Sequence, residues 1–218
     1  MAAPKSFFLS PEIHEYVVAH GTPPDAVQQA LIDETAALPM AMMQISPEQG
    51  AFMTLLTRAL GVREAVEVGT FTGYSALAIA RGLPDDGHLL CCDVSEEWTN
   101  VGRAAWADAG VDAKIELVIA PAADTLRALP DEEYVDLAFI DADKPSYPVY
   151  YEELLRRLRP NGLILVDNTL WGGAIVDAAN TDESTVAMRA FNDMVAADTR
   201  VDTALLTIGD GLTLLRKR

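Results

Sequence analysis

The stretch Val66-Glu67-Val68-Gly69-Thr70-Phe71-Thr72-Gly73-Tyr74-Ser75 decides the fold, because it joins an apolar strand to a helix through a glycine-rich turn. Glycine in such a turn lets the chain bend tightly and lets a ligand approach the backbone. The spacing is G-x-x-x-G, whereas a dinucleotide-binding turn has G-x-G-x-x-G and a Walker loop ends in G-K-[ST]. The turn is therefore typical of a ligand site, but it disfavours a pyrophosphate.

Segments with strand character and segments with helix character alternate along the chain. Five short apolar runs are expected to be strands: Ala65–Val68, His88–Cys92, Lys114–Ile119, Val135–Ile140 and Gly162–Val166. Six longer segments have the spacing of one apolar helix face: Pro47–Leu60, Tyr74–Arg81, Glu96–Asp108, Ala123–Leu129, Tyr147–Leu158 and Ser184–Ala197. This alternation predicts a parallel sheet with helices on both faces.

The C-terminal part breaks this alternation. Two β-rich segments, Thr203–Ile208 and Leu212–Arg216, flank Gly209-Asp210-Gly211, which is a hairpin signal. We expect an α/β fold with a doubly wound, mostly parallel sheet that ends in an antiparallel hairpin. The 218 residues are expected to form one domain, with a helical segment at 1–45 and the core at 46–218. Gly21-Thr22-Pro23-Pro24 is expected to separate two N-terminal helices.

The composition excludes several classes of protein. The chain has 16 Lys and Arg against 33 Asp and Glu, a formal charge of −17, and 50% hydrophobic residues. Such acidity argues against partners that carry phosphate charge, namely nucleic acids and anionic membranes. Cys91 and Cys92 are adjacent and form no disulfide framework. No signal peptide and no membrane-spanning apolar run is recognised, so a cytoplasmic protein is expected.

Two acids, one just before the turn and one at the end of the next strand, each have two interpretations. Asp93 follows the strand His88–Cys92 and lies 24 residues after Gly69, close to the ~20 expected for an acid that binds a ribose diol. Alternatively, Asp93 caps the helix that begins near Ser95. Glu67 lies within an apolar strand, and Glu is rarely buried without a partner. It either faces a cationic or amine group of a ligand or extends its carboxylate into solvent at a strand edge.

Polar side chains also follow two later strands. Asp141 and Lys144 come after Val135–Ile140, and Asp167 and Asn168 come after Gly162–Val166. In open α/β sheets ligands bind at the carboxyl edge of the strands, so Asp141, Asp167 and Asn168 are expected to converge. An all-oxygen set suits Mg²⁺, with Ca²⁺ or Mn²⁺ as alternatives. Lys144 is either a proton acceptor or charge partner beside a substrate, or a solvated loop residue that pairs with Asp141 or Asp143.

These residues together resemble the caffeoyl-CoA and catechol type of S-adenosylmethionine-dependent O-methyltransferase. Four segments carry the resemblance: Glu67-Val-Gly-Thr-Phe-Thr-Gly-Tyr-Ser75, Phe139-Ile-Asp-Ala-Asp-Lys144, Val166-Asp-Asn-Thr-Leu-Trp171 and Ile208-Gly-Asp-Gly-Leu-Thr213. The segment from Pro39 to Gly50 is similar as well, so the resemblance runs from about Pro39 to the end. It implies a seven-stranded sheet and, usually, a homodimer.

The resemblance also implies roles for individual residues. The positions that match donor contacts are Met43, Glu67, Gly69, Ser75, Asp93, Ala122 and Asp141. The metal ligands carry over to Asp141, Asp167 and Asn168. Lys144, with Asp141 beside it, matches the catalytic position and is the implied general base. Trp171 lies beside the implied acceptor pocket.

The acceptor expected from the sequence is a small phenolic or catechol-like molecule. The segment after Trp171 lacks basic residues until Arg189, whereas a coenzyme A ester is expected to need bases at the pocket entrance. The alternatives are a caffeoyl-CoA-type thioester and, in other classes, a nicotinamide-dependent oxidoreductase or a non-catalytic ligand-binding protein.

Overall fold

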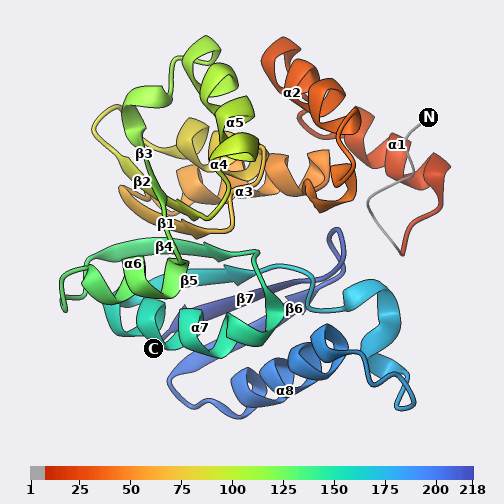
Figure 1. The fold of residues 1–218 in the computed structure, drawn as a ribbon, viewed down its shortest axis with the longest axis vertical. Helices are drawn as coiled ribbons and strands as arrows, with labels where there is room; N and C mark the ends of the chain where they lie inside the picture. The colour runs from red at the N-terminus through yellow and green to blue at the C-terminus, as the bar shows by residue number, and fades with distance from the viewer. Residues whose placement is uncertain (1–7) are drawn as a thin grey trace.

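The computed structural model describes residues 8–218, and the first part of the predicted N-terminal segment, residues 1–7, lies outside them. Within the described part the chain forms a seven-stranded sheet with the order β3-β2-β1-β4-β5-β7-β6. The first five of these strands run parallel to one another, and β7 pairs antiparallel with both β5 and β6. The predicted fold class and the C-terminal hairpin are confirmed (Figure 1).

The strands lie close to the predicted segments. Their bounds are β1 Glu64–Val68, β2 His88–Asp93, β3 Ile115–Ile119, β4 Val135–Ile140, β5 Leu158–Val166, β6 Val201–Leu206 and β7 Leu212–Lys217. The main difference is β5, which begins four residues earlier than the expected Gly162. Its first residue, Leu158, pairs with Val135 across a register shift in β4.

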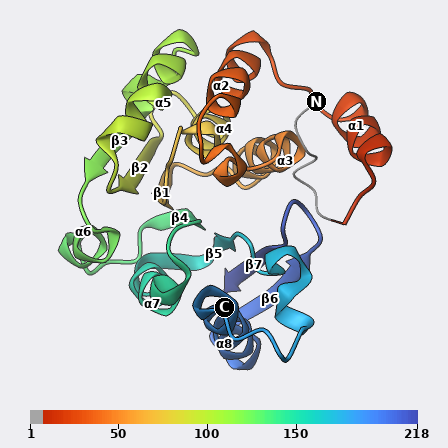
Figure 2. The same cartoon turned by 45° about the vertical axis from the view of Figure 1, so that its right-hand side comes forward.

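The helices cover both faces of the sheet. In chain order the α-helices are α1 Pro11–His20, α2 Ala26–Ala36, α3 Pro47–Ala59, α4 Tyr74–Gly82, α5 Glu96–Asp108, α6 Ala122–Ala128, α7 Tyr147–Arg157 and α8 Glu183–Ala197. Figures 1 and 2 show α3, α4 and α5 on one face and α6, α7 and α8 on the other. Alternate residues of each strand therefore enter two separate hydrophobic cores.

The two N-terminal helices are separate, as the Gly21-Thr22-Pro23-Pro24 segment predicts. Helix α2 packs near α4 and α5 and contributes the buried Leu31 to the core on that face. Helix α1 buries none of its residues and contacts α3. Within residues 8–218, no helix is long and apolar enough to cross a membrane.

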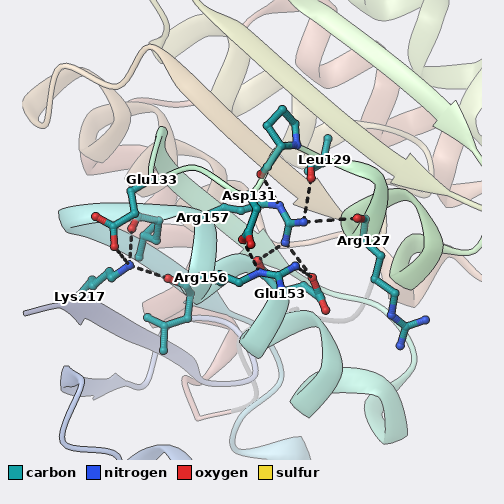
Figure 3. Close-up of polar contacts among 11 residues, drawn as sticks. Arg127, Leu129, Asp131, Glu133, Glu153, Arg156, Arg157 and Lys217 are labelled. Atoms are coloured by element: carbon teal, nitrogen blue, oxygen red, sulfur yellow. Dashed lines mark hydrogen bonds and ion pairs between the residues drawn. The ribbon is translucent and has the colours of Figure 1, made fainter.

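A buried arginine joins the loop before β4 to the end of α7. The Arg157 guanidinium is fully buried and donates to the backbone oxygens of Pro130, Leu129 and Glu153, each at 2.9 Å (Figure 3). It also donates to the Glu153 carboxylate at 2.8 Å and to the Arg127 oxygen at 3.5 Å. Because the guanidinium has five N–H groups, these contacts satisfy all of its donors.

Candidate active site

A cavity of about 1280 Å³ opens at the carboxyl edge of the parallel strands. Ten of the eleven predicted site residues line it: Met43, Gly69, Ser75, Asp93, Ala122, Asp141, Lys144, Asp167, Asn168 and Trp171. The remaining one, Glu67, is buried and does not line the cavity. The topology therefore brings together residues that are up to 128 positions apart, from Met43 to Trp171.

The glycine turn is shaped by close contacts with its neighbours. Gly69 has φ +88°, and a Cβ atom there would lie 1.9 Å from the backbone oxygen of Asp141. Gly73 has φ +79°, and a Cβ atom there would meet the ring of Trp106 at 2.6 Å. Both positions therefore require glycine for two independent reasons, backbone conformation and space.

Asp93 holds the same turn from the next strand. One carboxylate oxygen accepts hydrogen bonds from the backbone N–H groups of Thr70 and Phe71, both at 2.8 Å, and the other accepts from Ser95 N–H at 2.8 Å. Ser95, rather than Asp93, is the residue that caps α5. A carboxylate offers about four lone-pair sites, so Asp93 keeps capacity toward the cavity that it lines.

Glu67 is completely buried in the central strand β1, so its side chain does not extend into solvent. It lies between Cys91 of β2 and Phe139 of β4 in the sheet register. Neither carboxylate oxygen has a hydrogen-bond partner that meets ordinary geometric limits, although the side chains of Ser75 and Thr70 lie next to it. Burial raises the pKa of Glu67 to about 7. Ser75 and Thr70 line the cavity, whereas Glu67 does not.

Lys144 lies at the centre of the polar group at the ends of β4 and β5. Its Nζ donates to Asn168 Oδ1 and to the Tyr147 hydroxyl, both at 2.6 Å, and to Asp141 Oδ1 at 3.2 Å. The side chain is buried, and Nζ also lies 5.5 Å from the centre of the Trp171 ring. An ammonium group has three donors, so in this arrangement Lys144 is a charge partner for the acidic group.

Asp167 is buried beside this lysine. Burial is the main cause that raises the pKa of its carboxyl, and the negative charge of Asp141 raises it further. The backbone N–H of Asn168 donates to Asp167 Oδ1 at 2.7 Å and partly offsets this effect. A second positive charge near Asp141 and Asp167 would stabilise both carboxylates in their ionised forms.

The oxygen-rich group has the donor chemistry of a hard divalent cation. Among the described residues, the structure assembles no set of three His, Cys, Asp or Glu side chains in a metal-binding arrangement. A cation at this edge would therefore need the amide oxygen of Asn168 as its third protein ligand, beside Asp141 and Asp167. The contact between Asn168 Oδ1 and Lys144 Nζ shows that this oxygen already faces a positive charge.

The cavity has an apolar side and a separate set of charged lining residues. Apolar side chains line the side formed by α2 and the short helix η1, Ala41–Met43, and include Ile32, Met40 and Met42. The charged side chains of the lining are Asp93, Asp141, Asp143, Asp167, Asp210 and Lys144. Lys144 is therefore the single basic side chain in the lining that residues 8–218 provide.

Arg189 is not available to the cavity. Its guanidinium donates to the backbone oxygens of Ile175 at 2.8 Å, of Asn180 at 2.9 Å and of Ala174 at 3.2 Å. Arg189 thus holds the loop after Trp171, and it is absent from the residues that line the cavity.

The sequence did not single out three polar residues that complete the site. Tyr147 binds Lys144, Asp210 lines the cavity from the β6–β7 hairpin, and Gln49 lines it from α3. The position of Tyr147 three residues after Lys144 was a usable signal, because such residues share a face of a helical segment. Asp210 lies within the hairpin signal Gly209-Asp210-Gly211, and Gln49 lies within the similar segment Pro39–Gly50, but neither pattern predicts a role for these two side chains in the site.

Comparisons with known proteins agree with this geometry. The O-methyltransferase family matches residues 20–218. The chain belongs to this family. The chain is 41% identical over 210 residues to Probable caffeoyl-CoA O-methyltransferase 2 of Dictyostelium discoideum, and the match covers 94% of this chain and 91% of the relative. The prediction of an O-methyltransferase of the caffeoyl-CoA type is confirmed.

Two solved structures of O-methyltransferases share the fold over almost the whole chain. The O-methyltransferase from Bacillus cereus, in complex with SAH, has a TM-score of 0.86 and 31% identity, with 95% of this chain and 97% of that chain covered. TomG from Streptomyces achromogenes, involved in tomaymycin synthesis and in complex with SAM, has a TM-score of 0.85 and 30% identity, with 94% and 96% covered. Family membership decides against a nicotinamide-dependent oxidoreductase.

Proposed function

We propose that this O-methyltransferase transfers a methyl group from S-adenosylmethionine to a hydroxyl of a small catechol-like acceptor, with a divalent cation as cofactor. The observation that carries the proposal is the convergence of Asp141, Asp167, Asn168 and Lys144 in one cavity beside the glycine turn. Chemistry of this kind requires two reactants to be held in line, which is largely a matter of orientation.

The donor side of the cavity suits a ligand without phosphate. S-adenosylmethionine is a sulfonium cation, and the acidic lining complements its charge. Met43, Gly69, Ser75, Ala122 and Asp141 are the proposed donor contacts, with Asp93 on the ribose hydroxyls. Glu67 would act from behind Ser75 and Thr70 rather than by lining the cavity. Within the described residues, three buried polar atoms of the same lining make no hydrogen bond of ordinary geometry, namely Ser46 Oγ, Gln49 Nε2 and Thr70 Oγ1, and they favour a polar ligand there.

Titration calorimetry tests the donor. S-adenosylmethionine is expected to bind, and NAD, which shares its adenosine part, is expected not to. Asp93→Ala should weaken donor binding at least tenfold, because it removes the proposed ribose contact and loosens the turn that Thr70 and Phe71 form. Binding of NAD alone would contradict the proposal.

Asp141, Asp167 and Asn168 would hold the cation, which is Mg²⁺ in this proposal, with Ca²⁺ or Mn²⁺ as alternatives. The chemistry that a divalent cation supplies when bound is orientation of the two vicinal hydroxyls and stabilisation of the phenolate. Lys144 lies beside the same oxygens, and as general base it would accept a proton only after losing one of its own. The Tyr147 hydroxyl would keep the Lys144 amine in place during this exchange.

Activity with added Mg²⁺ and with chelator tests the metal. Asp167→Ala and Asn168→Ala are expected to abolish metal-dependent methyl transfer while calorimetry still detects donor binding. Asp177→Ala is a suitable control, because this acid is exposed in the loop after Trp171 and does not line the cavity. Full activity in chelator would remove the metal from the mechanism.

The charge of the cavity favours an acceptor without phosphates. A coenzyme A ester carries several phosphate charges, which would meet five aspartates and only Lys144 among the described lining residues. Arg189, the first base after Trp171, is committed to backbone oxygens of its own loop. Apolar Met40 and Met42 and the ring of Trp171 offer a surface for an aromatic ring instead.

Caffeate and caffeoyl-CoA form a matched pair of acceptors, because they share the catechol ring and differ in the coenzyme. We expect kcat/KM to be higher for caffeate and for simple catechols than for caffeoyl-CoA. Free coenzyme A is expected not to inhibit. Much faster methylation of caffeoyl-CoA would favour the alternative acceptor, which is the one that the Dictyostelium relative's name specifies.

We further propose that the enzyme is a homodimer in the cytoplasm and forms one domain over residues 1–218. These proposals rest on the family resemblance and on the composition of the chain. Light scattering on the purified chain distinguishes a dimer from a monomer of 23.5 kDa.

A further inference from the structure

The β6–β7 hairpin carries an acidic side chain into the cavity. Asp210 lies between Gly209, with φ +56°, and Gly211, with φ +90°, at the tip of this hairpin. The backbone oxygen of Asp210 accepts from Leu170 N–H, and that of Gly211 accepts from Thr169 N–H, both at 3.0 Å. The hairpin tip is therefore fixed to the segment that follows Asn168.

The Asp210 carboxylate is held by this segment. It accepts a hydrogen bond from the backbone N–H of Gly172, and the side chain of Asn168 lies next to it. A Cβ atom at Gly211 would lie 2.6 Å from the backbone nitrogen of Leu170, so the hairpin approaches as closely as glycine allows. The carboxylate thus reaches Asn168 from a rigid support.

The Asn168 amide has two chemically different ends, an oxygen that accepts and an NH₂ group that donates. An ionised carboxylate only accepts, so the NH₂ group is the end of the amide that Asp210 can bind. Lys144 Nζ only donates, and it lies 2.6 Å from the oxygen end. The two neighbours therefore select the same orientation of the amide, with the oxygen directed toward the group of Asp141 and Asp167.

We propose that Asp210 is a positioning residue that fixes the amide of Asn168 so that its oxygen faces the cation site. This inference rests on the metal dependence proposed above. A bound cation would compete with Lys144 for Asn168 Oδ1, and Asp210 would then be the polar neighbour that still restrains the amide. Partners of this kind, one step behind a metal ligand, are commonly worth 10–100-fold in metal affinity.

Mn²⁺ binding, followed by the electron paramagnetic resonance of the free ion, tests this role without measuring activity. Asp210→Ala is expected to weaken Mn²⁺ binding about 10–100-fold. Asp210→Asn keeps an acceptor oxygen, so Mn²⁺ affinity is expected to change less than about threefold. Donor affinity and the unfolding midpoint should stay close to wild type, and Asp177→Ala is the matched control. If Asp210→Ala does not fold, Asp210→Ser replaces it, because the shorter hydroxyl does not reach both partners.

The decisive comparison repeats Asp210→Ala in an Asn168→Asp background. A carboxylate presents oxygen at both ends, so its orientation needs no selection, and there Asp210→Ala should not weaken Mn²⁺ binding. An equal loss in both backgrounds would overturn the inference in favour of a charge effect or a structural role. Unchanged binding in Asp210→Ala would also overturn it. A wild-type enzyme that binds no Mn²⁺ would instead remove the metal site itself, together with this inference.

Discussion

The molecule has two groups of buried charge at opposite ends of strands β4 and β5, and they are constructed differently. At the amino end, Arg157 has a protein acceptor for each of its five donors (Figure 3). Toward the carboxyl end, Asp167 is buried next to another acid, and the two oxygens of Glu67 have no partner of ordinary geometry. The first arrangement stabilises the fold, whereas the second keeps unsatisfied polar capacity for a ligand.

Lys144→Met should produce the largest effect on function in this comparison. The change removes the cation that contacts Asp141 and Asn168, and kcat is expected to fall about 10²–10⁴-fold, the usual contribution of a proton-transfer group. The unfolding midpoint should change little, because the lost contacts serve the ligand site. Methyl-transfer kinetics at saturating donor and thermal unfolding measure the two quantities. Activity within threefold of wild type would end the catalytic interpretation of Lys144.

Arg157→Met should lower stability and leave catalysis nearly unchanged, which is the opposite of the result expected for Lys144→Met. It leaves the buried oxygens of Leu129 and Pro130 without their donor, so the free energy of unfolding is expected to drop by about 3–5 kcal/mol. For a chain of this size the midpoint would fall by roughly 6–20 °C. At temperatures where the variant is folded, kcat/KM should stay close to wild type.

Arg156→Met is the matched control for this loss of stability. Arg156 is the neighbouring residue and also pairs with Glu153, but its side chain is 49% exposed. The expected cost is below about 1 kcal/mol, as is usual for exposed ion pairs. Similar losses for the two arginine variants would contradict the distinction between buried and exposed charge.

Glu67→Gln should have a smaller and pH-dependent effect on stability. Burial raises the pKa of Glu67 from 4.5 to about 7, so the folded state favours the protonated acid. The stabilising contribution of protonation is fully present below pH 4.5 and is lost as the pH rises through about 7. At pH 8, without donor, the variant should be more stable than wild type by about 1–3 kcal/mol, and the difference should vanish near pH 4.5.

Denaturant unfolding at pH 8, 6.5 and 5 measures this difference. Glu64→Gln is a control in the same strand, because the Glu64 side chain is 42% exposed and should show no comparable dependence on pH. A Glu67→Gln variant that is less stable than wild type at pH 8 would show that the carboxylate is well partnered in the folded protein.

Much of the fold could be predicted because local signals and burial agree. Helix α5, Glu96–Asp108, has the predicted bounds, since Ser95 caps it and its apolar residues recur at helical spacing. The start of β5 could not be predicted, because Arg159-Pro160-Asn161 has the composition of a turn. These residues nevertheless continue a strand that pairs with β4 across an irregular register.

The site residues, too, could be predicted only where a local sequence pattern marks them. Strand-end residues such as Asp141 and Asn168 could be found, because the carboxyl edge of a parallel sheet gathers them. The burial of Glu67 depends on which side chains pack around it, and these include Thr70 from the turn and Ser75 from the start of α4. The presence of Asp210 in the cavity depends on where the hairpin tip meets the chain after β5, and no local pattern encodes that contact.

The order of strands in the sheet has a consequence for synthesis on the ribosome. Strand β7, Leu212–Lys217, is inserted between β5 and β6, although it is the last of the described strands along the chain. During translation β6 cannot join the sheet until residues 212–217 have left the exit tunnel. The hairpin tip with Asp210 reaches its place at the same moment. A nascent chain can therefore form the glycine turn after β1 early, but it completes the hairpin side of the cavity only when β7 has emerged.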